Sequence, residues 1–154
     1  MREYKFRGKR LDNGDLVFGD LRLVEGKSYI LDYDIGDDGI SQMQKIFNIH
    51  HEVDPETVGQ YTGLTDRKSK KIYEKATVLI TGTQELDYGL TFEWNDRAVV
   101  RWSEEECGFY LDVINKREVG LCQDGYFTVD TFPLRKWEEG EWDIEYEVFE
   151  EGAI

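Results

Sequence analysis

The chain has 154 residues, of which 40% are hydrophobic and 14% aromatic, enough for a packed interior, and this composition excludes wholesale disorder. The formal net charge is −14 and unevenly spread: residues 1–75 carry 13 Lys or Arg against 14 Asp or Glu, whereas residues 76–154 carry 6 against 19. An acidic second half repels phosphate groups, so direct binding of nucleic acid is disfavoured. No apolar run approaches the roughly 20 residues of a membrane-spanning helix, and the charged start does not resemble a signal peptide. We therefore expect a soluble, intracellular protein that does not bind membranes.

Short alternating segments separated by turns fill the first part of the chain. Alternation of apolar and polar residues predicts half-buried strands, and Asn13-Gly14 favours a type I′ hairpin turn. Residues 40–53 are either a short strand or an irregular connection. The strands predicted here are residues 4–9, 16–24 and 29–33. Together they predict an N-terminal antiparallel β meander within residues 1–52.

Residues 53–75 form a separate polar segment rich in turn residues. Asp54-Pro55-Glu56-Thr57 is either a one-turn helix, with Asp54 as its cap and Pro55 at its first position, or an ordinary turn. The rest of this segment is interpreted as a crossover that leads to a strand near Lys71.

Strand patterns return in residues 76–154 at intervals typical of a small barrel or sandwich. Residues 126–129 are a further strand or an edge, and residues 134–137 a short strand or a helical turn. The clearest strands are residues 76–80, 90–94, 98–102, 108–113 and 144–149.

Candidate chemical sites are weak. His50-His51 with Glu52 and Asp54 suggests a metal site, but adjacent strand residues point to opposite faces and zinc needs three or four convergent ligands. The Asp-rich run 32–39 does not have the spacing of a calcium loop. Cys107 and Cys122 are expected to be free thiols. We therefore expect no catalytic residues, no metal and no cofactor, and thus no enzyme.

Three blocks of the sequence resemble the YopX family, a phage-associated family of unassigned function. They are Lys5-Phe6-Arg7-Gly8-Lys9 with Asn13-Gly14 and Val17-Phe18-Gly19-Asp20, then Val53 to Leu64, and then Lys71-Ile72-Tyr73-Glu74. Two places depart from the family pattern: Arg67-Lys68-Ser69-Lys70 stands where an Asn-Gly turn is expected, and Lys75-Ala76 replaces Gly-Asp. The resemblance implies a mainly β fold with an SH3-like barrel over residues 76–154. It also implies a phage or prophage origin and a cytoplasmic location in the bacterial host.

Two charged features bear on partners. The basic residues near the amino terminus, together with Arg67-Lys68 and Lys70-Lys71, are either a nucleic-acid face or an edge that pairs with the acidic half of the chain. The tail, residues 138–154, holds eight acidic side chains and no basic one. It is either a solvated strand face that discourages edge pairing or a mimic of DNA charge.

These features favour a non-catalytic binding module that self-associates or binds a host protein. The alternative is an acidic DNA mimic that inhibits a host DNA-binding enzyme. Exposed aromatic residues and the neighbouring glutamates are the candidate contacts. The predicted interaction surface comprises Tyr61, Tyr73, Trp94, Trp102, Trp137, Trp142, Glu138, Glu139 and Glu141.

Overall fold

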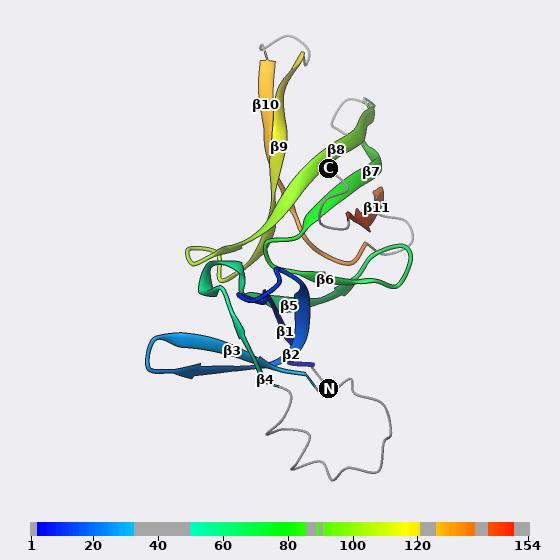
Figure 1. Cartoon of the computed structure of the whole chain (residues 1–154). Coiled ribbons are helices and arrows are strands. Elements are labelled where there is room, and N and C mark those ends of the chain that lie inside the picture. The colour runs from blue at the N-terminus through cyan, green and yellow to red at the C-terminus, as the bar shows by residue number, and fades with distance from the viewer. Residues whose placement is uncertain are drawn as a thin grey trace. The chain divides into compact units, whose positions relative to one another are not determined.

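A computed structural model describes residues 3–32, 50–85, 89, 91–120, 126–137 and 142–149, with only the backbone for 115–120 and 126–129. The chain is mainly β, as predicted, and forms two antiparallel sheets (Figure 1). It divides into two compact units, Met1–Gly63 and Leu64–Ile154. The division falls within strand β5 (Gly59–Thr65).

The first unit is built on four antiparallel strands. They are β1 (Phe6–Lys9), β2 (Leu16–Val24), β3 (Lys27–Leu31) and β4 (His50–Val53). The predicted meander is confirmed, since β1 pairs with β2 and β2 with β3. Strand β4 returns to pair with β3, which makes residues 50–53 a strand. The core here is small: Val17, Ile30 and Val53 are buried, with Phe6, Leu21 and Val58 packed against them.

The two hairpin turns of this unit are of different types. At Asn13-Gly14 only the glycine takes a positive φ, of 75°, so the type I′ prediction is wrong there. The side chain of Asn13 instead accepts a hydrogen bond from the Asp15 N–H, which stabilises a longer loop. The turn between β2 and β3 has positive φ at both Glu25 and Gly26, the geometry that a type I′ hairpin requires.

Residues 53–75 are more regular than the sequence suggested. Pro55–Thr57 forms the 3₁₀ helix η1, and the Asp54 carboxylate caps it by accepting a hydrogen bond from the Glu56 N–H. The segment that follows is strand β5 rather than a crossover; its glycines had suggested turns, but Gly59 and Tyr61 alternate as buried positions. Strand β6 (Lys71–Tyr73) comes next. The first sheet has the order β4-β3-β2-β1-β5-β6.

The second sheet has five strands in the order β10-β9-β8-β7-β11. They are β7 (Thr77–Glu85), β8 (Thr91–Ser103), β9 (Gly108–Gly120), β10 (Tyr126–Pro133) and β11 (Asp143–Val148). In Figure 1 the chain runs through β7, β8, β9 and β10 as neighbours before β11 returns beside β7. Within the described residues β10 and β11 are the two edges, so no closed barrel is seen. Residues 134–137 follow β10 without regular secondary structure, contrary to both predicted alternatives.

The hydrophobic core of the second unit lies on one face of this sheet. Strand β8 shows the cause: its apolar residues alternate with polar ones, so Phe92, Trp94, Ala98 and Val100 are buried while the residues between them are mostly exposed. Asp96 occupies a core-facing position in the same alternation and is buried. The sequence suggested two strands interrupted at 95–97, whereas the sheet carries one continuous strand.

Candidate functional site

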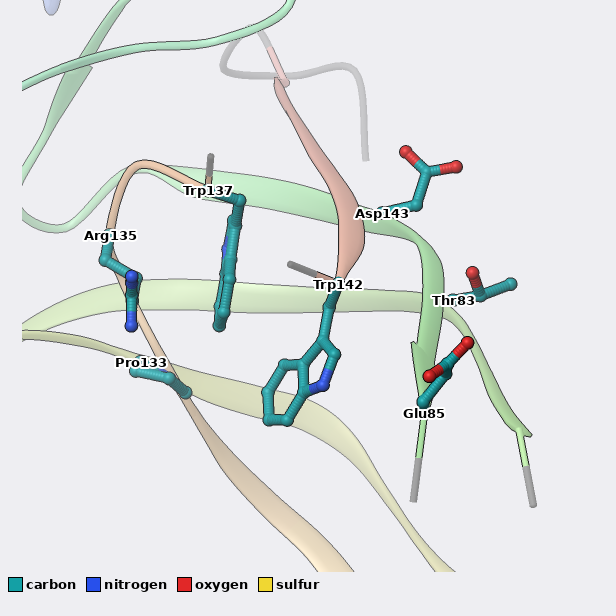
Figure 2. Close-up of a pocket in the computed structure, with 7 residues that line it drawn as sticks. All are labelled: Thr83, Glu85, Pro133, Arg135, Trp137, Trp142 and Asp143. Atoms are coloured by element: carbon teal, nitrogen blue, oxygen red, sulfur yellow. The ribbon is translucent and has the colours of Figure 1, made fainter. Parts of the chain in front are cut away.

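A pocket of about 540 Å³ lies at one end of the second unit. Its walls come from three places: the end of β7, the end of β10 with the segment after it, and the start of β11. Figure 2 shows two indole rings on one side of the pocket and the end of β7 on the other. The lining residues are Thr83, Glu85, Pro133, Arg135, Trp137, Trp142 and Asp143. We call this the Trp137–Trp142 pocket.

Three side chains form a stack along one wall. The Trp137 and Trp142 rings stack with centroids 5.0 Å apart and an angle of 29° between their planes. The guanidinium carbon of Arg135 lies 4.6 Å from the centroid of a Trp137 ring. Figure 2 shows Trp137 between Arg135 and Trp142, so the cation and the second indole cover opposite faces of it. Both tryptophans are half-buried and therefore leave part of their aromatic surface exposed.

Tyr146 of β11 fixes the position of this stack. Its hydroxyl accepts a hydrogen bond of 2.7 Å from the Trp137 indole N–H and lies 3.2 Å from the carbonyl oxygen of Arg135 and 3.3 Å from that of Pro133. Burial raises the pKa of Tyr146, although the hydrogen bond from Trp137 acts in the opposite direction. The hydroxyl therefore stays protonated and ties the segment after β10 to β11.

The register between β7 and β11 fixes the acidic rim of the pocket. Asp143 pairs directly with Thr83 across the two strands, and Glu85 lies two residues beyond Thr83 on the same face. Gly82 permits this approach, because a Cβ atom there would overlap the carbonyl oxygen of Asp143. Gly82 also has a φ of 124°, which favours glycine. The two carboxylates are thus placed by backbone pairing.

A second constellation joins the turn after β5 to β11. The buried carboxylate of Asp66 accepts hydrogen bonds from the backbone N–H groups of Lys68, Lys70 and Val148, at 2.9, 2.8 and 2.9 Å. Burial alone would raise the pKa of Asp66, but these three hydrogen bonds together hold it below its usual value. The backbone N–H of Arg67 also donates to the Tyr146 carbonyl. This arrangement is structural, since all three hydrogen-bond donors to the carboxylate are backbone groups.

The basic run after Asp66 pairs with acidic residues of its own unit. Arg67 lies 3.0 Å from a carboxylate oxygen of Glu147 and 3.8 Å from one of Glu145, and Lys68 lies 2.7 Å from Glu147. Hydrogen bonding by Lys68 and the charge of Arg67 lower the pKa of Glu147. For Arg67 and Lys68, the structure supports the alternative of an edge paired with the acidic half of the chain.

The predicted interaction residues fall into three groups. Tyr61, Tyr73 and Trp94 are buried, and the Trp94 indole N–H donates to the side-chain oxygen of Gln84 at 2.9 Å. Trp102 is 45% exposed and makes an edge contact with Phe109, away from the pocket residues. Only Trp137 and Trp142 are brought together in one pocket. The predicted glutamates Glu138, Glu139 and Glu141 lie outside the described residues.

Five pocket residues were not among the predicted interaction residues: Thr83, Glu85, Pro133, Arg135 and Asp143. The pairing of β7 with β11 places Thr83 and Asp143 opposite each other, and no pattern in the sequence shows that pairing. The alternation within β11 does place Asp143 on the face opposite the buried Ile144, a signal that was available.

The other candidate sites gain no support. No three His, Cys, Asp or Glu side chains gather as metal ligands in the described part of the chain. His50 and His51 are neighbours on β4, and His50 contacts the Tyr29 ring. Cys107 is a free, exposed thiol, whereas Cys122 lies outside the described ranges, as does most of the Asp-rich run. Among the residues that the structure describes, there is no helix with the length and apolar character to cross a membrane.

Comparison with known proteins places the chain in a family. The model of the family described as YopX protein matches residues 5–134, most of the chain. The chain belongs to the YopX family. This match confirms the resemblance and extends it beyond the first half, through β10 of the second sheet. Searches of curated proteins and of solved structures found no match. The YopX match ends before Trp137, so it covers only part of the pocket wall.

Proposed function

We propose that this YopX-family protein is a non-catalytic module that binds another protein through the Trp137–Trp142 pocket. The observation that supports this function best is the half-exposed stack of two tryptophans beside Glu85 and Asp143. Tryptophans partly open to solvent in a recess are typical anchors of protein interfaces. The polar groups of the stack hold the fold together: Arg135 covers one face of the Trp137 indole, and the Tyr146 hydroxyl accepts a hydrogen bond from the N–H of the same indole. We therefore assign the pocket to binding.

The proposal includes the setting in which the module acts. We infer a phage or prophage protein in the cytoplasm of a bacterial host, whose partner is a host protein or a second copy of the chain. We also infer that residues 76–154 follow an SH3-like barrel. The strand order supports this, because the last strand, β11, returns beside the first, β7.

Two measurements test the function together. Light scattering at low and high salt reports self-association, and a pull-down from bacterial lysate with tagged wild-type protein reports host partners. We expect a salt-sensitive complex that is lost in Trp142→Ala and kept in Glu104→Gln, a change in the turn between β8 and β9. A monomer at all concentrations that captures nothing specific contradicts the proposal.

The second candidate is an acidic DNA mimic, and one observation favours it. Asp143, Glu145 and Glu147 alternate on the exposed face of β11, next to the face of β7 that carries Glu85. Against it, Arg67 and Lys68 neutralise part of this charge. Competition with duplex DNA for a host DNA-binding enzyme decides the matter: displacement at micromolar protein supports mimicry, and its absence removes this candidate.

A further inference from the structure

We propose that the Trp137–Trp142 pocket binds the guanidinium group of an arginine side chain, stacked on the Trp142 ring between Glu85 and Asp143. The inference rests on the proposed function and adds the chemistry of the ligand: a partner that presents an exposed arginine. It is argued from the stack, the charge of the rim and the size of the pocket.

The protein already holds one guanidinium in the same way. Arg135 lies 4.6 Å from a ring centroid of Trp137, on the side opposite Trp142. A planar cation is attracted to an indole face because the ring quadrupole presents negative charge there. Figure 2 shows Trp142 between Trp137 and the end of β7, so its other side is turned toward Thr83 and Glu85. A second guanidinium on that side would extend the existing stack of Arg135, Trp137 and Trp142 by one more cation.

The rim supplies the counter-charge. Glu85 and Asp143 are exposed, and within the described residues neither carboxylate forms an ion pair with a Lys or Arg. Acidic groups of the same strand, Glu145 and Glu147, are by contrast paired with Arg67 and Lys68. The unneutralised charge of β11 is therefore concentrated at Asp143, at the mouth of the pocket. This electrostatic field attracts a cation and repels a phosphate.

Size and shape favour arginine as the cation. A volume of about 540 Å³ is within the range of pockets that hold small ligands and exceeds what a single metal ion needs. Arginine stacks on aromatic faces and donates hydrogen bonds in a fixed fork that matches carboxylates, whereas lysine is a strongly hydrated point charge. Two carboxylates beside an aromatic face thus suit a guanidinium better than an ammonium group.

Titration followed by nuclear magnetic resonance tests the inference on the full chain. The probe is an end-capped peptide Gly-Gly-Arg-Gly-Gly, and the matched probes replace arginine by its neutral isostere citrulline or by lysine. The Trp142 indole signal, assigned by its loss in Trp142→Phe, is expected to shift and saturate with a dissociation constant on the order of 1 mM. Citrulline should produce no saturable shift, and lysine should bind more weakly.

Variants separate the pocket from the general acidity of the chain. Glu85→Gln with Asp143→Asn is expected to weaken arginine binding by about three- to tenfold, and Trp142→Ala to abolish it. Glu104→Gln removes a charge from the turn at the other end of β8 and should change the affinity less than about twofold. The carboxylate variant leaves the core intact, so it remains informative if Trp142→Ala does not fold. Equal shifts with the citrulline peptide, or equal loss in Glu104→Gln, overturn the inference.

Failure of this inference differs from failure of the proposed function. A partner protein captured equally by wild type and by the Glu85 and Asp143 variant overturns the arginine pocket while the binding function stands. Saturable arginine binding at Trp142 in a protein that binds no macromolecule supports the pocket chemistry and contradicts the proposed function.

Discussion

The Asp66 carboxylate accepts a hydrogen bond of 2.9 Å from the backbone N–H of Val148, 82 positions further along the chain. The same carboxylate holds the turn between β5 and β6 through the N–H groups of Lys68 and Lys70. One buried side chain thus shapes a turn and anchors the last strand of the second sheet. Such a carboxylate contributes more than an exposed one, because its removal leaves backbone donors without a partner.

Asp66→Ala is expected to lower the free energy of unfolding by about 2–4 kcal/mol, since three backbone donors lose a charged acceptor at once. Urea unfolding followed by tryptophan fluorescence measures the loss. The matched control is Asp12→Ala, which removes an exposed carboxylate that pairs with Arg10 and should lower the free energy of unfolding clearly less. A loss at Asp66 no greater than that at Asp12 contradicts the assigned role.

The stabilisation by Asp66 should depend on pH. Its folded pKa is lower than the unfolded value of about 3.9, so the deprotonated form favours the native state. The contribution is complete above the unfolded pKa and is lost as the pH falls through the folded pKa. We expect the stability difference between wild type and Asp66→Asn to be constant from neutral pH to about pH 5 and to shrink below about pH 4. Urea unfolding of both proteins at each pH checks this; a difference that does not change with pH argues against the charged form.

Gly82→Ala is expected to destabilise the second unit by more than about 2 kcal/mol, because the new Cβ would overlap the Asp143 carbonyl and the backbone has a positive φ. The control is Gly108→Ala, also in a strand, where the added Cβ meets only one atom, at 3.9 Å. That variant should change stability by less than about 1 kcal/mol. Thermal unfolding of the two variants side by side distinguishes a required glycine from a tolerated one.

Tyr146→Phe is expected to lower the free energy of unfolding by about 1–3 kcal/mol. The reason is that the Trp137 indole N–H and the carbonyls of Pro133 and Arg135 lose their shared hydrogen-bond partner. Near-ultraviolet circular dichroism should also change, since the variant releases Trp137 from its fixed place beside Trp142. Tyr110→Phe, on the outer face of β9, serves as the control for loss of a hydroxyl group. An unaltered tryptophan signal in Tyr146→Phe would falsify the role given to this hydroxyl.

Two tryptophans that look alike in sequence should behave differently. Trp94 is 5% exposed and packs against Phe92 and Phe132, with ring centroids 5.0 and 4.7 Å away. Trp94→Ala is expected to lower the free energy of unfolding by about 3–5 kcal/mol. Trp102 is 45% exposed, so Trp102→Ala should cost less than half as much. Comparable losses in urea unfolding would mean that Trp102 is part of the core.

Local pattern predicted most strands and the pairing of the N-terminal meander, but not the pairing of β7 with β11. The alternation in β8 and β11 places the buried residues correctly, because one face of each strand must meet the core. The polar run at 95–97 suggested a turn, yet the neighbouring strands β7 and β9 hold it in an extended conformation. At residues 95–97 the hydrogen bonds to a neighbouring strand therefore outweigh the local preference for a turn.

The residues of the pocket were harder to predict from the sequence than the strands. Trp137 and Trp142 were singled out as aromatic residues, but so were Tyr61, Tyr73 and Trp94, which are buried. Exposure of an aromatic residue depends on the strands that cover it, and that information is non-local. Glu85 and Asp143 are 58 residues apart in the sequence, and they meet at the rim only because β11 returns to β7.

The outer edge of β11 has partners for several of the backbone groups through which a sheet normally grows. Phe149 donates its backbone N–H to the Thr77 carbonyl. In an antiparallel pair such bonds occur at every second residue, so the N–H and C=O groups of Ile144, Tyr146 and Val148 face away from β7. Of these, the Ile144 N–H bonds to the Trp142 carbonyl, the Tyr146 carbonyl accepts from Arg67, and the Val148 N–H bonds to Asp66. These partners occupy three of the six backbone groups that face outward, so a strand of another molecule finds only an incomplete ladder along this edge. Strand addition along β11 is therefore hindered, which favours recognition of a partner through side chains over growth of the sheet.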